Sequence, residues 1–444
     1  MKPQTTYPED HDTGRRAVVT GVGFCLPGLS GPVFTADQAW DVAANGRSCL
    51  QYDEVYYGTV DLTQEMFDEH FPDLPPFFSR HYTSAHRYGM LSLAHACEDA
   101  GLDFRGGELG DAAVLVGRGG VDANIDSYLS VLRADPATTS APEAMELFVA
   151  AQQAVTPSDV ALVQSALLRS NGPVYTVSCG CASSAVQIGH ARQMITRGEA
   201  DIAVVTGVDV FNVQLIQNIQ RLLHGAQQTY ESVRTPGMPD AVPSFLSLMR
   251  PYDRRASSIN HGEGSATLII ESWDHAVRRG AHLYGQILAT AMTRDGLANP
   301  LACDETGGEL VAAVRRCLGD RWDLGNIPYV HGGSDGNVVV TAFEAAAVQE
   351  LYGAGRTPLV TSQEGCFGHN GAPAGCVGVA LTLMMMERGQ VCPTANCEQP
   401  ADVLTFDPVP GVRPRPLDFD YALSFNYQVG GVKNAILLGS TQAV

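Results

Sequence analysis

The chain has 444 residues and a formal net charge of −20 at pH 7, with 45% hydrophobic and 17% charged residues. This length suits two fused halves around a large core, and the negative charge argues against nucleic acid or an anionic membrane as a partner. The eleven cysteines are scattered without a CxxC pair, which disfavours a disulfide framework or a zinc site and favours a reducing, cytoplasmic location.

The N-terminal part predicts a short tail followed by alternating strands and helices. Residues 1–14 contain acidic residues and no apolar core, which predicts a disordered tail rather than a secretory signal. Residues 16–21 predict a buried strand that ends in a glycine turn. The 3.6-residue apolar period over residues 80–101 predicts a helix, and residues 112–116 predict the next strand. Residues 120–170 are expected to be mostly helical.

The stretch from residue 174 to 209 organises the first half. It predicts a strand, a Ser-Cys-Gly-Cys turn, a helix over 182–197 and a second buried strand. Cys181 then lies at a helix N-terminus, where unpaired N–H groups and partial positive charge favour the thiolate. We therefore expect Cys181 to be a nucleophile, with a buried structural cysteine as the alternative. Cys179 precedes the turn and is expected to point into the core.

The next segment leads into another strand. Residues 211–248 have no clean period and are expected to form a loop-rich cap. His261 lies in a polar turn punctuated by glycines, ahead of a strand over 266–271. It could be catalytic, but a histidine in such a turn is more often a surface residue.

The second half resembles a weaker copy of the first, because strand, small-residue turn and helix recur in the same order. Residues 327–330 predict a short buried strand ending at His331. A second strand over 357–361 leads into a glycine-rich loop that contains His369, and residues 377–388 predict an apolar helix. Two α/β halves that each bring reactive residues from their turns imply a site at their junction.

A cysteine with two histidines is what acyl-thioester chemistry needs. The Cys181 thiolate attacks an acyl carbonyl, and the neutral imidazoles of His331 and His369 polarise a second thioester and stabilise the enolate formed on decarboxylation.

The motifs carrying these residues resemble the elongating β-ketoacyl-acyl-carrier-protein synthases, including the ketosynthases of type II polyketide systems. The resemblance covers about residues 15–440, and its markers are RRAVVTGVG, TVSCGCASSAVQIGHARQMITRGEADIAVVTGVD, RPYDRR, GEGSATLIIES, HGGS, FGHNGAPAG and VGGVKNAILL. It implies a thiolase-like five-layered αβαβα fold of two pseudo-repeated halves. Residues 15–272 would carry the nucleophile, and residues 273–444 would carry both histidines.

The same resemblance assigns further roles. Cys181 would be the acylated nucleophile, and Tyr427 would be a pocket-gating aromatic ahead of the paired glycines Gly430 and Gly431. No metal or organic cofactor is implied, because the phosphopantetheine arm would arrive on the acyl carrier protein. The protein is expected to form a homodimer, or a heterodimer with a ketosynthase-like subunit.

Three positions depart from the family pattern. Glu364 replaces a lysine ahead of the second histidine, Gly378 replaces a glutamate nine residues after it, and Gly333 replaces a threonine after the first histidine. Lysine and carboxylate vanish together, which avoids the cost of about 3–5 kcal/mol for an unpaired buried charge. Lys433 could supply a cation instead, but an exposed position is expected.

Glu364 has two interpretations. Near Cys181, it would oppose ionisation of the thiol by like-charge repulsion, or act as a general base for an amine or alcohol acceptor. The alternative is that Glu364 turns away to pair with an arginine.

Three functions follow. In the first, Cys181 accepts an acyl chain and condenses it with a malonyl-carrier thioester by decarboxylative chemistry. In the second, a divergent acyltransferase passes the acyl group to an oxygen or nitrogen nucleophile without decarboxylation. In the third, the chain is a non-catalytic partner subunit like the chain-length factors, which resemble this fold but lack the cysteine.

Overall fold

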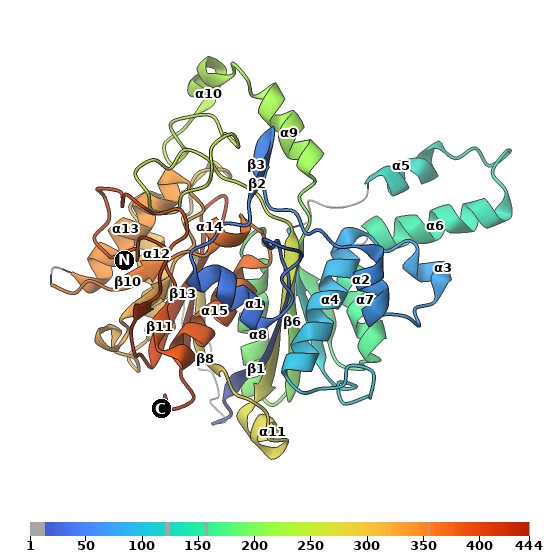
Figure 1. Ribbon diagram of the computed structural model, residues 1–444, viewed down its shortest axis with the longest axis horizontal. Coiled ribbons are helices and arrows are strands. Elements are labelled where there is room, and N and C mark those ends of the chain that lie inside the picture. The colour runs from blue at the N-terminus through green and yellow to red at the C-terminus, as the bar shows by residue number, and fades with distance from the viewer. Residues whose placement is uncertain (1–13, 120–124, 156–158, 354, 444) are drawn as a thin grey trace.

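The computed structural model describes residues 14–119, 125–155, 159–353 and 355–443 (Figure 1). The tail expected over residues 1–14 therefore lies outside the described residues except for Gly14.

One order of elements occurs twice along the chain. The first half runs through β1 (Ala17–Cys25), α4 (Ser84–Asp99), β4 (Ala113–Gly117), α7 (Asp159–Leu168), β5 (Val174–Val177), α8 (Ser183–Thr196), β6 (Ile202–Asp209) and β7 (Gly264–Ser272). The second half runs through β8 (Gly285–Arg294), α12 (Gly308–Leu318), β9 (Tyr329–His331), α13 (Val338–Tyr352), β10 (Leu359–Thr361), α15 (Ala374–Arg388), β13 (Tyr421–Gln428) and β14 (Val432–Gly439).

The strand order mirrors this repeat. It reads β10-β9-β13-β14-β8-β1-β7-β6-β4-β5, which is symmetrical about the junction of β8 and β1. In the first half β4 is parallel to β5 and β6, and β7 is antiparallel to β6 and β1. The second half repeats this pattern of directions. β1 joins β8 through two residue pairs, Val18 with Gln286 and Val19 with Gly285.

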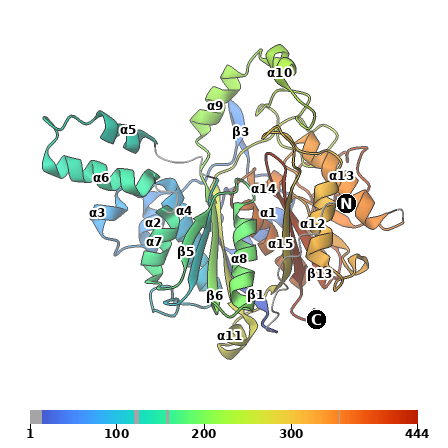
Figure 2. The ribbon, with the colours of Figure 1, turned by 180° about the vertical axis from the view of Figure 1, so that it is seen from behind.

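Helices cover both faces of each five-stranded half. Because successive residues of a strand face opposite sides, Leu115 packs with α8 and α15, whereas Val114 packs with α4 and α7. In the second half Tyr329 faces the same central helices, and Val330 packs with α12 and α13. The layers are α4 with α7, a sheet, α8 with α15, a sheet, and α12 with α13 (Figures 1 and 2). The predicted five-layered αβαβα arrangement is confirmed.

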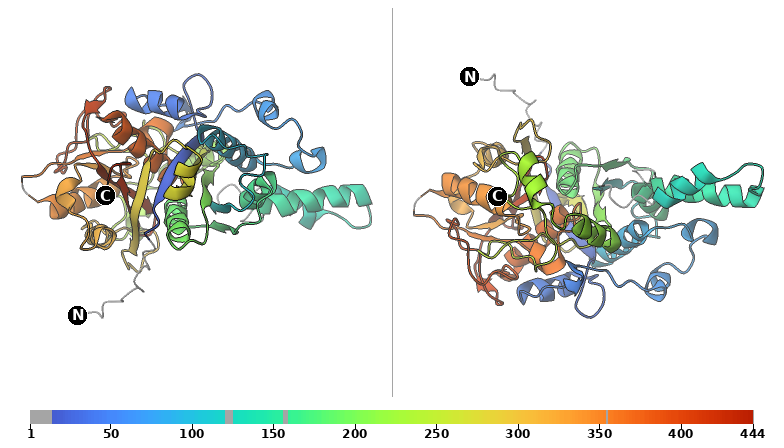
Figure 3. Two further views of the ribbon diagram at one scale, coloured as in Figure 1. Left: turned by 90° about the horizontal axis from the view of Figure 1, so that it is seen from below. Right: turned by 90° about the horizontal axis from the view of Figure 1, so that it is seen from above.

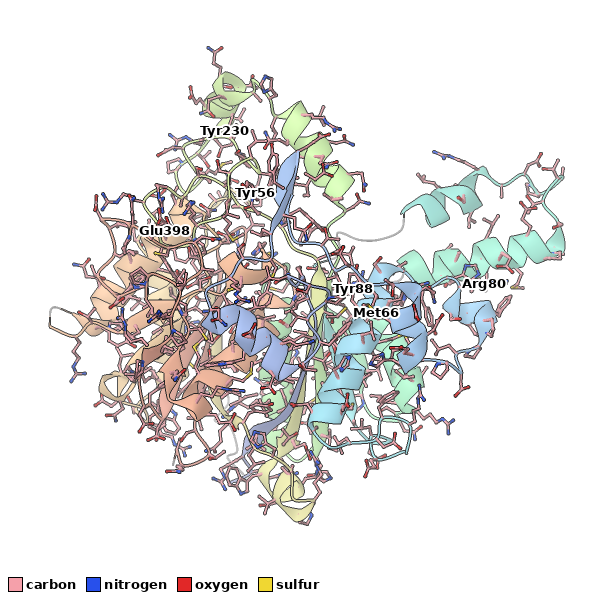
Figure 4. All side chains as sticks on the ribbon, in the orientation of Figure 1. Tyr56, Met66, Arg80, Tyr88, Tyr230 and Glu398 are labelled. Atoms are coloured by element: carbon pink, nitrogen blue, oxygen red, sulfur yellow. The ribbon has the colours of Figure 1, made fainter. Side chains whose placement is uncertain are left out.

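A cap covers one end of these layers. It contains the hairpin of β2 (Gln51–Asp53) and β3 (Val55–Tyr57), with α9 (Val213–Leu222) and α10 (Gln227–Val233). The backbone N–H of Tyr56 donates to the Phe245 carbonyl at 2.9 Å, and the Tyr230 hydroxyl donates to the Pro239 carbonyl at 2.9 Å (Figure 4).

The expectation of a loop-rich segment over 211–248 is wrong in part, because this segment contains two helices. The Asn212 side chain accepts hydrogen bonds from the backbone N–H groups of Gln214 and Leu215 and so begins α9. Ile216 of α9 is buried in a cluster with Val55 and Tyr57, and Val213 and Ile219 pack against that cluster, so the helix carries a short apolar face with a spacing of three residues.

The other described elements lie around this body. They are α1 (Ala36–Ala44), α2 (Gln64–His70), α3 (Pro76–Ser79), α5 (Ile125–Arg133), α6 (Ala141–Val155), α11 (Trp273–Arg278), the 3-10 helix η1 (Leu324–Asn326), α14 (Glu364–Phe367), β11 (Gln390–Val391) and β12 (Arg415–Pro416). α5 and α6 project sideways beyond the layers (Figure 3). No helix in the described part of the chain is long and apolar enough to cross a membrane.

Candidate active site

A tight turn between β5 and α8 presents Cys181, two residues ahead of the first residue of the helix. The Ser183 hydroxyl accepts a hydrogen bond from the Cys179 N–H at 2.9 Å and donates to the Gly180 carbonyl at 2.6 Å. Gly180 has a φ of 48°, and a Cβ there would meet the Gln428 side chain at 2.8 Å. The turn therefore requires glycine between the two cysteines.

His369 faces Cys181 from the other half. Its Nε2 lies 2.9 Å from the Cys181 Sγ, and its Nδ1 lies 3.0 Å from Glu364 Oε2. His369 follows α14, which begins at Glu364, so one short helical turn supplies both groups. Sulfur, imidazole and carboxylate thus form a continuous chain of three side chains.

The contacts of His369 with Cys181 and Glu364 favour the protonated imidazole. Burial alone would lower the pKa of His369, but the charges of Cys181 and Glu364 hold this pKa well above its usual range. Burial raises the pKa of the Glu364 carboxyl, and His369 opposes that change. Glu364 therefore pairs with His369, and the arginine partner considered as an alternative is not what the structure contains.

His331 does not join this chain. It is the last residue of β9 and is buried, and neither ring nitrogen has a hydrogen-bond partner within the described ranges. Burial lowers the pKa of His331 to about 4, so the ring is neutral at pH 7. A Cβ at Gly378 would lie 2.8 Å from the His331 ring, so the ring occupies space that only a glycine leaves open.

A cavity of about 540 Å³ opens in front of Cys181. Its described lining includes Cys181, Glu364, His369, Gly333 and Tyr427, but not His331. The structure thus brings five of the expected site residues together around one cavity, and the buried His331 is not part of the described lining. Within the described ranges, no three His, Cys, Asp or Glu side chains gather in a way that could hold a metal ion.

His261 also lines the cavity, so the expectation of a surface position is wrong. Its ring stacks on Phe211 with 4.4 Å between centroids and lies 5.9 Å from the His369 ring. The turn is held there because the His369 N–H donates to the Asn260 carbonyl at 2.8 Å. Burial lowers the pKa of His261 to about 3. Nothing in the local sequence signals this long-range pairing.

Two further expectations are wrong. Cys179 is only partly buried, and its Sγ donates to Gln428 Oε1 at 3.2 Å instead of entering the core. Lys433 is fully buried rather than exposed: its Nζ lies 3.0 Å from Asp295 Oδ2 and 3.7 Å from the Phe343 ring centre. Pairing with Asp295 keeps this cation behind the cavity wall.

Comparison with known proteins agrees with this architecture. The family described as beta-ketoacyl synthase, N-terminal domain, matches residues 15–276, and the corresponding C-terminal domain matches residues 284–398. The chain belongs to the beta-ketoacyl synthase family.

Named relatives span nearly the whole chain. The tetracenomycin polyketide synthase ketoacyl synthase alpha subunit of Streptomyces glaucescens is 25% identical over 96% of this chain and 97% of its own length. The 3-oxoacyl-[acyl-carrier-protein] synthase 2 of Vibrio cholerae is 24% identical over 95% of this chain and 98% of its own length.

Solved structures share the fold, which confirms the predicted thiolase-like class. The ishigamide ketosynthase/chain length factor aligns with a TM-score of 0.76 at 21% identity, covering 96% of this chain and 99% of that one. A second structure is a type II polyketide synthase acyl-carrier protein in complex with its ketosynthase bound to the hexaketide. It aligns with a TM-score of 0.74 at 18% identity, covering 96% of this chain and 100% of that one.

Departures from the family pattern fit one another in this member of the beta-ketoacyl synthase family. A Cβ at Gly333 would lie 2.9 Å from the Tyr427 ring, so a threonine there would collide with this tyrosine. Glu344 holds both residues, because Oε1 accepts from the Gly333 N–H and the Tyr427 hydroxyl, each at 2.7 Å. Its Oε2 accepts from the Tyr252 hydroxyl at 2.7 Å. Tyr427 is therefore fixed as part of the cavity wall.

The paired glycines lie beyond the cavity lining given above. Gly430 and Gly431 have φ values of 88° and 89°. A Cβ on Gly430 would lie 2.3 Å from the Pro300 carbonyl oxygen, and one on Gly431 would lie 2.5 Å from Asp295 Oδ2. Both glycines are required by the tight turn between β13 and β14.

Proposed function

We propose that this protein is an acyltransferase that receives its acyl group from an acyl carrier protein and passes it to an oxygen or nitrogen nucleophile. The observation that carries the proposal is the chain from Cys181 Sγ to His369 Nε2 at 2.9 Å and from His369 Nδ1 to Glu364 Oε2 at 3.0 Å. A nucleophile, a base and a group that orients the base are the parts that covalent acyl transfer needs.

In the first step the Cys181 thiolate attacks the carbonyl carbon of the incoming thioester. The tetrahedral intermediate collapses with cleavage of the bond from carbon to the carrier sulfur, and the His369 imidazolium gives its proton to that sulfur. Acyl-Cys181, a free carrier thiol and a neutral His369 result.

In the second step Glu364 decides which nitrogen of neutral His369 keeps the proton. A carboxylate only accepts hydrogen bonds, so the Nδ1 proton stays toward Glu364 and the Nε2 lone pair faces the acyl group. His369 is then a base for an incoming O–H or N–H. It is not an N–H donor for an enolate, which decarboxylative condensation would require of it.

The expected partner is an acyl carrier protein. The polyketide complex described above joins an acyl-carrier protein to its ketosynthase, and the Cys181 cavity is of a size that accepts a thioester at the end of a flexible arm. A homodimer, or a heterodimer with a ketosynthase-like subunit, remains part of this proposal.

Decarboxylative condensation is the second candidate, and membership of the beta-ketoacyl synthase family favours it. It requires His331 to deliver a second N–H donor to the cavity.

The test separates these functions. The protein is incubated with octanoyl-N-acetylcysteamine, and in parallel with an octanoyl acyl carrier protein, and acylation is located by peptide mass spectrometry. The acyl-enzyme is then given hydroxylamine or malonyl-carrier thioester, and carbon dioxide release is measured.

We expect octanoyl-Cys181 in the wild type, none in Cys181→Ala, and an unchanged amount in the matched control Cys179→Ala. Discharge by hydroxylamine that is faster from the folded than from the denatured octanoyl-enzyme, without carbon dioxide release from malonyl thioester, supports acyl transfer. Carbon dioxide release with carbon–carbon bond formation would make condensation the function. Absence of any acyl-Cys181 would support a non-catalytic partner subunit.

A further inference from the structure

We infer that a second cavity, on the outer face of the first sheet, binds an uncharged apolar molecule that ends in a hydroxyl group. The cavity has a volume of about 890 Å³, and its described lining shares no residue with that of the Cys181 cavity. The proposed acyl transfer makes no use of it, so the two sites can be tested separately.

The walls of the second cavity are mostly apolar. It lies where α3, α4, α7 and the C-terminal end of α6 meet (Figure 1). Phe78 on α3 and Leu162 on α7 line it and are 47% and 54% exposed, and Phe71, Met90 and Leu167 add further apolar side chains. An apolar ligand would remove this surface from water, which is favourable in proportion to the area covered.

A buried histidine faces this apolar space. His86 is the third residue of α4, has an exposed fraction of 0% and belongs to the cavity lining. Its Nε2 has no hydrogen-bond partner in the part of the chain that the structure describes. Leaving a buried polar atom unpaired costs free energy, so a ligand atom that pairs with Nε2 would be stabilised there.

The protonation of His86 determines what kind of ligand atom it needs. The Thr83 backbone N–H donates to His86 Nδ1 at 3.0 Å, so Nδ1 carries no proton. Burial, together with the charge of Arg118, lowers the pKa of His86 to about 3. The ring is therefore neutral at pH 7 with its proton on Nε2, and the ligand atom must be a hydrogen-bond acceptor.

A neighbouring carboxylate argues for an uncharged ligand. Asp159 also lines the cavity, and its Oδ2 lies 3.5 Å from His86 Nε2, which is too far for a good hydrogen bond. An anion that accepts from Nε2 would be repelled by this carboxylate. Arg118 pairs with Asp159 at 2.6 Å and both side chains are buried, so the pair has no net charge to compensate an ion for its lost hydration.

The other charged side chains of the lining lie at the rim of the cavity. They are Asp73, Arg105 and Arg169, and all three are exposed. Water and salt therefore screen their charges. The buried end, with His86 and Asp159, is expected to select the polar group of the ligand.

A hydroxyl group meets both requirements of the buried end. Its oxygen accepts from the Nε2–H of His86, and its hydrogen can be donated to the Asp159 carboxylate. An ether oxygen would accept but would have no proton to donate. The Tyr82 ring stacks on the His86 ring with 5.4 Å between centroids, so the donor is held in place before a ligand arrives, which lowers the cost of binding.

The first experiment compares three probes that share a benzene ring and a butyl chain. para-Butylphenol carries a hydroxyl group, para-butylanisole a methyl ether and para-butylbenzoate a carboxylate. Their dissociation constants for the purified protein are measured by isothermal titration calorimetry. We expect para-butylphenol to bind about tenfold more tightly than either of the others, because its hydroxyl both accepts from His86 and donates to Asp159.

A variant of His86 places the binding in this cavity. His86→Phe keeps a ring against Tyr82 and removes the Nε2–H. The affinity advantage of para-butylphenol over para-butylanisole should fall about fivefold in this variant and stay unchanged in His224→Phe, which alters an exposed histidine of the cap. Because the advantage compares two probes on the same protein, a general loss of stability does not alter it.

A second variant tests the apolar wall without touching a buried residue. Leu162→Arg brings a charge to the wall at an exposed position of α7, where the fold should tolerate it. We expect this variant to bind para-butylphenol more weakly than wild type. Leu222→Arg, at a residue of α9 that is 80% exposed, is the matched control and should bind para-butylphenol as wild type does.

Equal affinity for the three probes, or tighter binding of para-butylbenzoate, would overturn this inference. An unchanged phenol advantage in His86→Phe, or unchanged affinity in Leu162→Arg, would place the binding elsewhere and overturn it too. If none of the probes binds, water alone occupies the cavity and the inference is wrong. None of these outcomes bears on acylation of Cys181, so the proposed function keeps its own test.

Discussion

At the scale of single residues, one carboxylate sets the behaviour of His369. The family pattern has a lysine at position 364, which would donate to its neighbours, whereas Glu364 accepts from Nδ1 at 3.0 Å. In the proposed mechanism, this carboxylate keeps the proton of neutral His369 on Nδ1, because a carboxylate only accepts hydrogen bonds.

Glu364→Gln tests this directly. The carboxylate is one of two charges that raise the pKa of His369, so we expect its removal to lower that pKa and shrink the pH range in which thiolate and imidazolium coexist. Alkylation of Cys181 by iodoacetamide at pH 7 should therefore be slower in Glu364→Gln than in wild type, because the imidazolium that stabilises the thiolate is less populated.

The raised pKa of His369 also predicts how the stability of the fold depends on pH. A histidine whose pKa is raised stabilises the fold at low pH, and this stabilisation is lost as the pH rises through the raised value. The difference in Tm between wild type and Glu364→Gln should therefore shrink on the alkaline side. Exposed Glu350→Gln is the matched control, and an unaltered alkylation profile in Glu364→Gln would contradict the assignment.

At the scale of elements, the packing of α8 against α15 brings the two halves of the site together. A Cβ at Gly375 would lie 2.6 Å from the Ala185 backbone nitrogen and 2.8 Å from the Ser184 hydroxyl. The Ser184 hydroxyl also accepts from the Cys376 N–H at 3.2 Å. The helices can approach this closely only because position 375 has no side chain.

Gly375→Ala is expected to push α15 away from α8 and cost about 1–3 kcal/mol in unfolding free energy. Because Cys181 precedes α8 and His369 precedes α15, the acylation rate of Cys181 should fall as well. Urea denaturation and acylation kinetics measure the two effects.

Gly308→Ala, at the first turn of α12, serves as the control. Its nearest neighbour would be the Thr306 hydroxyl at 3.5 Å, an ordinary contact. If Gly375→Ala and Gly308→Ala were equally stable, the close approach of α8 and α15 would not depend on the missing side chain at position 375.

At the scale of the whole molecule, two buried carboxyl groups make stability depend on pH. Glu344 is held by two tyrosines and a backbone N–H. Glu263 accepts from the Val60 N–H at 2.9 Å and from the hydroxyl of Tyr88, the residue labelled in Figure 4, at 3.1 Å. Burial raises the pKa of each carboxyl from 4.5 to about 7, although their hydrogen bonds oppose it. Ionisation of each carboxyl therefore lowers the free energy of unfolding as the pH rises.

Glu344→Gln should weaken this pH dependence. A carboxyl whose folded pKa is raised gives its full stabilisation below pH 4.5 and loses it by about pH 7, which amounts to about 3 kcal/mol per group. We expect the variant to lose about 1–3 kcal/mol less than wild type between pH 5 and pH 7 in urea denaturation.

Glu271→Gln provides a control of opposite sign. Although burial would raise it, Arg279, Thr20 and His275 together lower the pKa of Glu271, so this carboxylate stabilises the fold at pH 7 and less at lower pH. If Glu344→Gln and Glu271→Gln altered the pH dependence of the unfolding free energy in the same direction, this account would be wrong.

Sequence patterns predicted the repeated order of strands and helices, the placement of Cys181 ahead of a helix, and the family. These features are local, since a strand, a capped helix and a glycine turn are each written in a few consecutive residues. The position of His369 opposite Cys181 followed from the family pattern, whereas its hydrogen bond to Glu364 did not.

What only the tertiary structure decided depends on contacts between distant segments. His331 and His369 read alike as histidines in glycine-rich turns, yet one is buried next to Gly378 and the other lies against the thiol. His261 enters the cavity because its turn pairs with the His369 loop, more than 100 residues away. Sequence determined the elements and the place of Cys181 ahead of a helix, and packing decided which imidazole contacts its thiol, because side-chain position depends on neighbours that no local pattern encodes.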